Sequence, residues 1–210
     1  MVVHTERSPA EEQLVTAFRG VFDASVMNFG SYNLVYAENL LAAGRQSEAA
    51  SNGRRRAADR SSSGHEGPGS SSSEPGSPAG RRGQAEEELS VQEAVASSRH
   101  LLVGYRREPV EIVLCPVDLD QTLARLGEYD DAVAMAQVPA LLNLTNLAGM
   151  ATEGSTVQIV FSTGRRLTLS LQPEVQFPQA EQVPLHQHLD LEDFYDFLDY
   201  FMDRVEQKQL

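Results

Sequence analysis

One pair of histidines, His186 and His188, is separated by a single residue, a spacing that occurs in metal-binding sites. A His-x-His pair can bind a metal ion when further ligands converge on it. The sequence has neither a Cys-x-x-Cys pair nor a His-Glu-x-x-His motif to supply such ligands. We therefore expect no metal site and interpret the pair as part of a polar loop.

The single cysteine and the paired carboxylates give no stronger sign of catalysis. Cys115 lies in a β-rich run without a nearby histidine, which predicts a buried, inert thiol. The pairs Asp118/Asp120 and Asp130/Asp131 occupy turn-like positions, where aspartate caps helices and closes loops. No glycine-rich phosphate loop follows a strand. We expect a protein that is not an enzyme and that uses no cofactor.

Charge is distributed unevenly along the 210 residues, whose formal net charge is −13. Seven arginines against four acidic residues give the stretch from Arg45 to Gln84 a balance of +3, so the rest of the chain carries −16. A body this acidic repels nucleic-acid phosphates and anionic lipid surfaces, and it suits a partner with basic or amphipathic segments. We expect another protein as the partner, and neither nucleic-acid binding nor membrane association.

The length suits one domain, residues 1–210, with a core of 8–42 and 98–207. Between them, residues 43–97 form a Ser/Gly/Arg-rich insertion that we expect to be mostly disordered, because its first part has no Leu, Ile, Val or aromatic side chain. A short helix is expected over Glu86–Ser97.

The insertion also holds three consecutive arginines, Arg54, Arg55 and Arg56. They could make an electrostatic contact with an acidic partner or with the acidic body of the chain itself. The single cysteine, the lack of a signal peptide and the lack of any run of 18 apolar residues predict a cytoplasmic protein.

Local signals predict the elements at both ends of the core. Ser8-Pro9-Ala10-Glu11 combines a capping box with proline at the first helical position, so a helix begins there and ends near Met27. A half-buried strand is expected over Ser31–Ala37. Asp190 should cap a closing helix. Its buried stripe steps by three and four residues through Leu191, Phe194, Leu198, Phe201 and Val205.

Two hairpins are predicted after the insertion. Leu101–Tyr105 and Val110–Val117 flank a turn-like break, and Thr156–Phe161 and Arg166–Leu171 flank Thr163-Gly164. The apolar range Ala132–Leu147 fits either strands or a helix entered at Pro139, and we favour the helix. The favoured fold is α+β: helix, three strands, helix, two strands and helix around an antiparallel sheet.

That element order resembles the type III secretion effector chaperones of the Tir-chaperone class and the related YbjN-like proteins. The match rests on Leu141-Leu142-Asn143-Leu144, the hairpin strands Gly154–Phe161 and Gly164–Leu171, and Leu189–Phe194 at the start of the last helix. The resemblance implies a homodimer that holds an extended segment of a client protein without turnover. The client-binding residues to test are Phe18, Val21, Phe22, Tyr32, Leu34 and Tyr36.

The alternative takes Ala132–Val138 and Leu141–Leu147 as strands, which gives seven strands and one final helix. That pattern resembles a pleckstrin-homology-like barrel. The resemblance implies an adaptor that binds a peptide or a phosphoinositide, with the arginine-bearing insertion near the ligand. The acidic body argues against a membrane surface.

Overall fold

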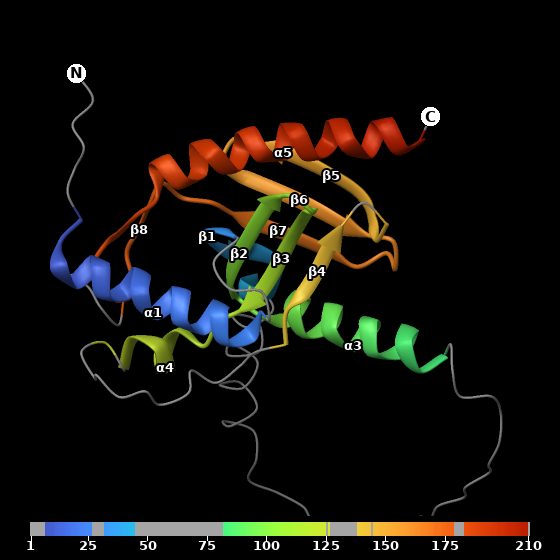
Figure 1. Cartoon of the computed structure of the whole chain (residues 1–210). Coiled ribbons are helices and arrows are strands. Elements are labelled where there is room, and N and C mark those ends of the chain that lie inside the picture. The colour runs from blue at the N-terminus through green and yellow to red at the C-terminus, as the bar shows by residue number, and fades with distance from the viewer. Residues whose placement is uncertain are drawn as a thin grey trace, which may run out of the picture.

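The computed structural model describes residues 7–26, 32–44, 82–124, 126, 138–143, 145–178 and 183–209. They form a mixed helical and stranded fold built on one large antiparallel sheet (Figure 1). The predicted α+β class is therefore confirmed. Within these residues no helix is long and apolar enough to cross a membrane.

Seven strands make the sheet. Their bounds are β1 (Asn33–Asn39), β2 (His100–Arg107), β3 (Val110–Pro116), β4 (Ala140–Asn143), β5 (Leu147–Glu153), β6 (Thr156–Phe161) and β7 (Arg166–Ser170). They lie in the order β4-β3-β2-β1-β7-β6-β5, and every neighbouring pair is antiparallel. Strands β2 to β4 run across the direction of β5 to β7 in Figure 1, so the sheet folds over on itself.

The main core lies between the two halves of this folded sheet. Alternate residues of each strand point inward, as the period of two requires. The fully buried strand residues include Ala37, Leu101, Val103, Ile112, Leu114, Leu142, Val157, Phe161 and Leu169. Both predicted hairpins are confirmed, and in the second one Gly164 takes a φ of 83°, a left-handed conformation that glycine adopts freely.

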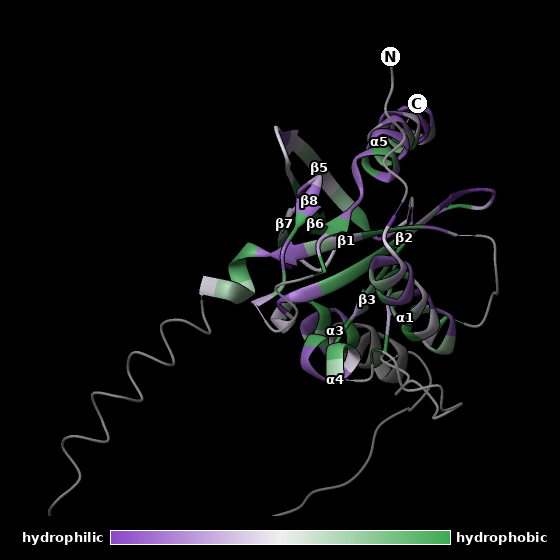
Figure 2. Cartoon of the chain, turned by 90° about the vertical axis from the view of Figure 1, so that its left-hand side faces the viewer, coloured by the Kyte–Doolittle hydropathy of each residue, from purple (hydrophilic) through white to green (hydrophobic). Residues whose placement is uncertain are grey.

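The closing helix α5 (His188–Gln209) covers one end of this core (Figures 1 and 2). Four residues of the predicted stripe are buried and the fifth, Val205, packs partly buried against the same core. Phe197, outside that stripe, is also fully buried. The predicted start was wrong by three residues: a cap at Asp190 would make Leu191 the first helical residue, whereas the helix begins at His188 and Asp190 lies in its first turn.

Helix α3 (Arg82–Ser97) lies at the other end of the core in Figure 1. It includes the helix predicted over Glu86–Ser97 and begins earlier. Val95 and Ala96 are buried in the main core, so the packed body starts within the range 43–97. Residues 45–81 lie outside the described residues.

Helix α1 (Pro9–Ser25) covers the outer face of β1 to β3, and the short helix α4 (Leu119–Ala124) lies beside it. Helix α1 begins as predicted, because the Glu11 N–H donates to the Ser8 Oγ at 3.2 Å and Pro9 is the first helical residue. A second core forms between this layer and the sheet. A two-strand ribbon of β8 (Glu174–Val175) and β9 (Leu185–His186) borders it.

The favoured helix over Ala132–Leu147 is wrong where the structure describes it. Residues Ala140–Asn143 form β4, paired with β3, and Leu147 begins β5. Pairing places Ala140 and Leu142 opposite buried residues of β3, and that burial decides between strand and helix. The sheet has seven strands, the number in the alternative arrangement, but they are not the same seven. The alternative's strand over Leu141–Leu147 spans most of β4 and the first residue of β5, and its strand over Ala132–Val138 falls mostly outside the described residues.

Candidate functional site

The two histidines of the His-x-His pair belong to different elements, His186 to β9 and His188 to α5. His186 is tied to α1, since its N–H donates to the Glu11 carboxylate at 2.7 Å and its Nδ1 lies 3.1 Å from the same group. His188 begins α5. Among the described residues no group of three or more His, Cys, Asp or Glu side chains could hold a metal ion.

Cys115 is fully buried in the outer core, as predicted, and burial raises the pKa of its thiol to about 11. Asp118 caps α4, because its carboxylate accepts the Gln121 N–H at 3.0 Å. Asp130 and Asp131 lie outside the described residues. The described carboxylates and thiol singled out from the sequence thus have structural contacts.

The six predicted client-binding residues come together in the layer between α1 and the sheet. Phe18, Phe22, Tyr32 and Tyr36 are at most 6% exposed. Val21 and Leu34 are partly buried against the same cluster. A client could reach the four buried rings only if α1 moved away from the sheet. The predicted electrostatic residues Arg54, Arg55 and Arg56 lie outside the described residues.

Three rings of this layer, Phe18, Tyr36 and Phe177, contact one another. Phe18 stacks on Tyr36 at a centroid distance of 5.9 Å, and Phe177 meets Tyr36 edge-on at 5.3 Å. The Tyr36 hydroxyl lies 2.6 Å from the Nδ1 of His100. Burial raises the pKa of Tyr36, so its hydroxyl keeps its proton at neutral pH.

His100 makes the stability of the fold depend on pH. Its burial lowers the pKa from 6.5, because the charged ring loses water, and Arg99 adds to the effect. The unfolded chain therefore binds a proton below about pH 6.5 that the folded chain excludes, and the stability contribution is lost as the pH falls below that value. We expect the free energy of unfolding to fall more steeply between about pH 6.5 and 5 than in His100→Asn.

Urea unfolding across that pH range measures the difference. Asparagine places an acceptor near the position of Nδ1 and does not titrate, so it separates the charge from the hydrogen bond. Parallel pH profiles for the two proteins would contradict the assignment.

A buried charged group lies at the other end of the layer. The Tyr32 hydroxyl donates to the Glu111 carboxylate at 2.5 Å, and Arg106 forms an ion pair with the same carboxylate. The Arg106 guanidinium lies over the Tyr32 ring, 4.4 Å from its centroid. Burial, together with the bond to Glu111, raises the pKa of Tyr32 to about 12. These three side chains join the residue before β1 to Arg106 of β2 and Glu111 of β3, so their role is structural.

The surface most open to a partner is the edge strand β5, which pairs only with β6 among the described strands. The Phe161 N–H donates to the Arg165 carbonyl at 2.9 Å, on the β7 side of β6. Alternation along β6 then directs the backbone groups of Gln158 and Val160 toward β5. Their partners are Ala151 and Gly149.

It follows that the backbone N–H and C=O groups of Met150 and Thr152 point to the outer edge of β5. The register shifts between Leu147 and Gly149, a bulge that brings Leu147 and Met150 to the same inner face, opposite Phe161 and Ile159. The edge therefore offers main-chain groups that no described strand pairs with, next to side chains that pack on the core.

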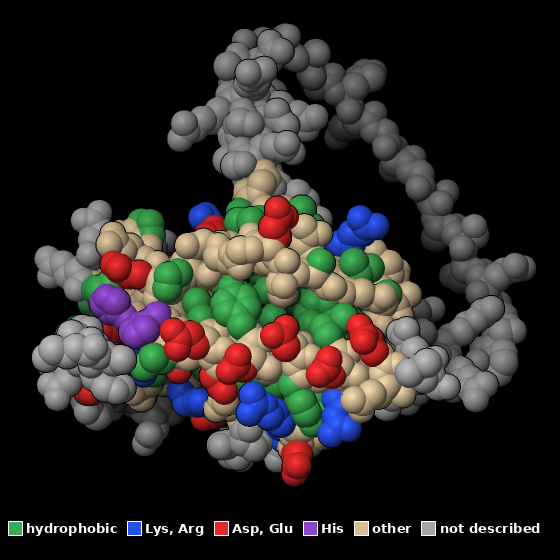
Figure 3. Space-filling model, turned by 90° about the horizontal axis from the view of Figure 1, so that it is seen from above, with side chains coloured by type: hydrophobic (Ala, Val, Ile, Leu, Met, Phe, Trp, Pro, Cys, Tyr) green, Lys and Arg blue, Asp and Glu red, His purple; other side chains and the backbone are tan. Residues whose placement is uncertain are grey.

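Four apolar residues of β5 and α5 form what we define as the apolar strip: Leu147, Met150, Tyr195 and Val205. All four are partly buried and pack against the main core. Tyr195 joins α5 to the end of β5, because its hydroxyl donates to the Gly154 carbonyl at 3.5 Å. Figure 3, which looks down on α5, shows hydrophobic side chains gathered next to a row of acidic ones.

That acidic row consists of four exposed residues of α5, spaced by three and four: Glu192, Asp196, Asp199 and Asp203. Such spacing places them along one side of the helix. Carboxylates this close repel one another and attract a cation. The β5 edge, the apolar strip and the acidic row together form the candidate binding surface.

The opposite edge of the sheet is closed. The Asn146 side chain accepts the Asn143 N–H at 2.9 Å and donates to the Leu141 carbonyl at 2.7 Å, which occupies the outer groups of β4. The backbone carbonyl of Asn146 also accepts the Ser162 N–H at 2.8 Å. Asn146 thus links the ends of β4 and β6 and leaves little of β4 for a partner.

Sequence reasoning missed β5, although it singled out the apolar stripe of α5. The strand reads Leu-Ala-Gly-Met-Ala-Thr-Glu, with small residues, a glycine and a bulge that interrupts the period of two. The signal that could have found it is the position of this segment before Gly154, where φ is 56°, and the confident strand β6.

No model of a known protein family, no curated protein and no solved structure matches the chain.

Proposed function

We propose that this chain is a non-enzymatic protein-binding module that holds an extended, basic segment of another protein along β5. The observation that carries the proposal is the outer edge of β5, whose unpaired groups at Met150 and Thr152 can pair with an added strand. Exposed edge strands template such pairing unless they are blocked, and β5 has neither proline nor lysine.

The apolar strip and the acidic row define what the segment should contain. Alternate side chains of an added strand point to opposite faces, so apolar residues can reach Met150 and Tyr195. Lys or Arg side chains can reach the row that includes Asp196 and Asp199. The fit is therefore best for a segment that alternates apolar with basic residues.

A second copy of the chain fits this surface less well. Antiparallel pairing of two β5 strands would bring two acidic rows together, and like charges at short range repel. The homodimer expected from the sequence would then form through another surface. The proposed function retains the extended client protein expected from the sequence and the expected reducing compartment, such as the cytoplasm. The proposed contact with the client differs, because it lies on β5 instead of on α1 and β1.

The number of strands and the closing helix support the pleckstrin-homology-like alternative over the chaperone-like order. Of its two ligands, a peptide is favoured. Three described arginines already have acidic partners: Arg99 pairs with Glu38, Arg106 with Glu111 and Arg107 with Asp193. These ion pairs partly neutralise the arginines and so weaken their attraction for a phosphoinositide.

Replacing Thr152 with proline should weaken the binding of a synthetic peptide that alternates valine with lysine, raising its Kd at least about tenfold. Proline removes the outward N–H and fills the edge, while the bonds of Gly149 and Ala151 to β6 remain. Fluorescence anisotropy of the labelled peptide measures the change. Thr152→Ala keeps the N–H and is the matched control, for which we expect binding within about twofold of the unchanged chain.

A peptide that alternates valine with glutamate should bind at least about tenfold more weakly, because the acidic row repels it. Equal binding of the two peptides, or undiminished binding by Thr152→Pro, would contradict the proposal. Light scattering on the same variants identifies a second copy as the occupant if Thr152→Pro converts a dimer into a monomer.

A further inference from the structure

A cavity of about 160 Å³ opens between α1, β1 and the start of α5, on a different side of the molecule from β5. Its floor is apolar and includes Val15, Phe18, Leu102 and Leu185. An apolar cavity of about 150 Å³ is large enough to bind benzene, so this one has room for a single leucine-sized side chain. We call it the α1–β1 cavity.

The cavity exists because β1 and β7 diverge. They pair only at Glu38 and Asn39, and none of the described strands lies beside the rest of β1 on that side. At Tyr36 the gap is closed by Gln187, whose side chain accepts the Tyr36 N–H at 2.9 Å and donates to its C=O at 3.0 Å. An amide side chain thus completes the pairing that a strand would supply.

One step earlier in β1 the same edge is open. Backbone groups alternate in direction, so those of Leu34 point to the same side as those of Tyr36. Leu34 lines the cavity, and within the described part of the chain no hydrogen bond joins its backbone to the residues on that side. The N–H and C=O of Leu34 can therefore pair with one amide group of a ligand.

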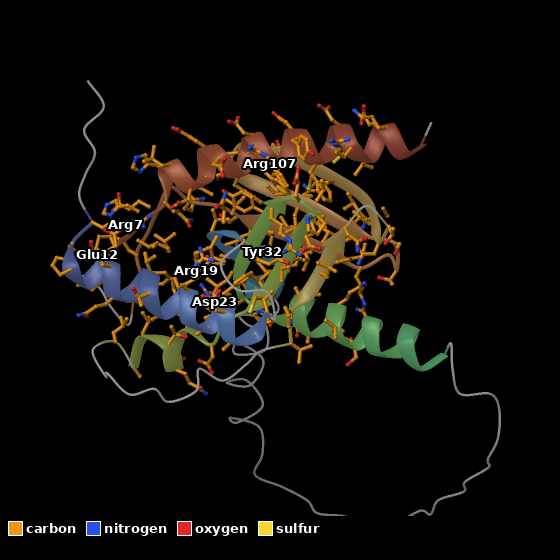
Figure 4. All side chains as sticks on the ribbon, in the orientation of Figure 1. Arg7, Glu12, Arg19, Asp23, Tyr32 and Arg107 are labelled. Atoms are coloured by element: carbon orange, nitrogen blue, oxygen red, sulfur yellow. The ribbon has the colours of Figure 1, made fainter. Side chains whose placement is uncertain are left out.

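The charged residues that line the cavity are Arg7, Arg19 and Asp190, which give it a net positive charge. Figure 4 shows Arg19 on α1, Arg7 before the first turn of that helix, and Tyr32 next to the start of β1. Arg7 donates to the Asp190 carboxylate at 2.8 Å. Arg19 donates one N–H to the Tyr32 carbonyl at 2.9 Å, which leaves further guanidinium donors for an anion.

We propose that the α1–β1 cavity binds a leucine-like residue with a free carboxylate and an acylated nitrogen, as at the C-terminus of a peptide. The apolar side chain occupies the floor, the carboxylate pairs with Arg19, and the amide pairs with Leu34. Gln187 blocks β1 beyond this point, so the ligand is a chain end and not a continuous strand. The site is independent of the β5 surface.

Titration of the full chain with N-acetyl-leucine tests the site by calorimetry or by amide chemical shifts of β1. We expect a Kd on the order of 1 mM, and a loss of about tenfold or more in Arg19→Gln, because a charge-assisted hydrogen bond is removed. Arg165→Gln is the matched control. Its guanidinium pairs with Glu93, 3.1 Å away on α3, so binding should not change.

Two further ligands and one further variant make the outcome decisive. N-acetyl-leucinamide lacks the carboxylate and should bind at least about tenfold more weakly, and equal binding would overturn the proposal. Free leucine, if it binds as tightly as N-acetyl-leucine, would overturn the assignment to a peptide end in favour of the free amino acid. Val15→Met extends a side chain into the cavity and should abolish binding. Absence of N-acetyl-leucine binding to the unchanged chain would also overturn it.

Discussion

Replacing Phe201 with alanine should lower the free energy of unfolding by about 3 to 5 kcal/mol. Phe201 is fully buried in the main core, and its ring lies 5.8 Å from that of Phe197. Alanine removes this apolar surface and leaves a cavity that the rigid strands below cannot close. Urea denaturation at neutral pH measures the change.

The matched control is Asp199→Ala, two residues earlier on the exposed side of α5. Its effect should stay within about 0.5 kcal/mol, because surface substitutions away from specific contacts change stability little. Equal small effects of Phe201→Ala and Asp199→Ala would mean that α5 does not complete the core.

Replacing Gly104 with alanine should destabilise the protein by about 1 to 3 kcal/mol, the usual range for an overpacked core. Gly104 lies in the middle of β2, and a methyl group there would overlap the ring of Phe22. Because Phe22 is 1% exposed, the ring has no free space into which it can turn. Glycine at this position lets α1 approach the outer face of the sheet.

A double-mutant cycle tests that contact directly. Leucine at position 22 is shorter at the point of overlap, so Gly104→Ala should cost less than about 0.5 kcal/mol in a Phe22→Leu background. The same cost in both backgrounds would show that the overlap with Phe22 is not the cause. Thermal or urea unfolding of the four proteins gives the coupling energy.

The elements with strong local signals were predictable from sequence. Ser8 and Pro9 set the start of α1, the apolar spacing of Leu191, Phe194 and Phe201 identified α5, and Gly164 marked a hairpin. Each signal depends on contacts within a few residues, which the sequence displays directly.

The segments that failed depend on distant partners. Leu141 and Leu142 fit a helix as well as a strand, and pairing with Val113 and Ile112 decides for the strand. The bulge before Met150 hid the period of β5. The candidate surface could not be located for the same reason, because it is an unpaired edge that exists only once the sheet order is known.

The aromatic residues chosen as client contacts illustrate a related limit. Phe18 and Tyr36 have the spacing of an apolar face, and the sequence cannot say whether a partner or the chain itself covers that face. In the fold α1 and β1 cover each other. Gln187 was not singled out at all, since its role depends on the divergence of β1 from β7.

Amide hydrogen exchange along β5 tests the central claim most directly. In the free protein the N–H groups of Met150 and Thr152 should exchange fast, while those of Gly149 and Ala151, bonded to β6, should be protected. Adding the valine–lysine peptide should slow exchange at Met150 and Thr152 and leave their neighbours unchanged. Peptide binding without new protection at these two amides would contradict strand addition at β5.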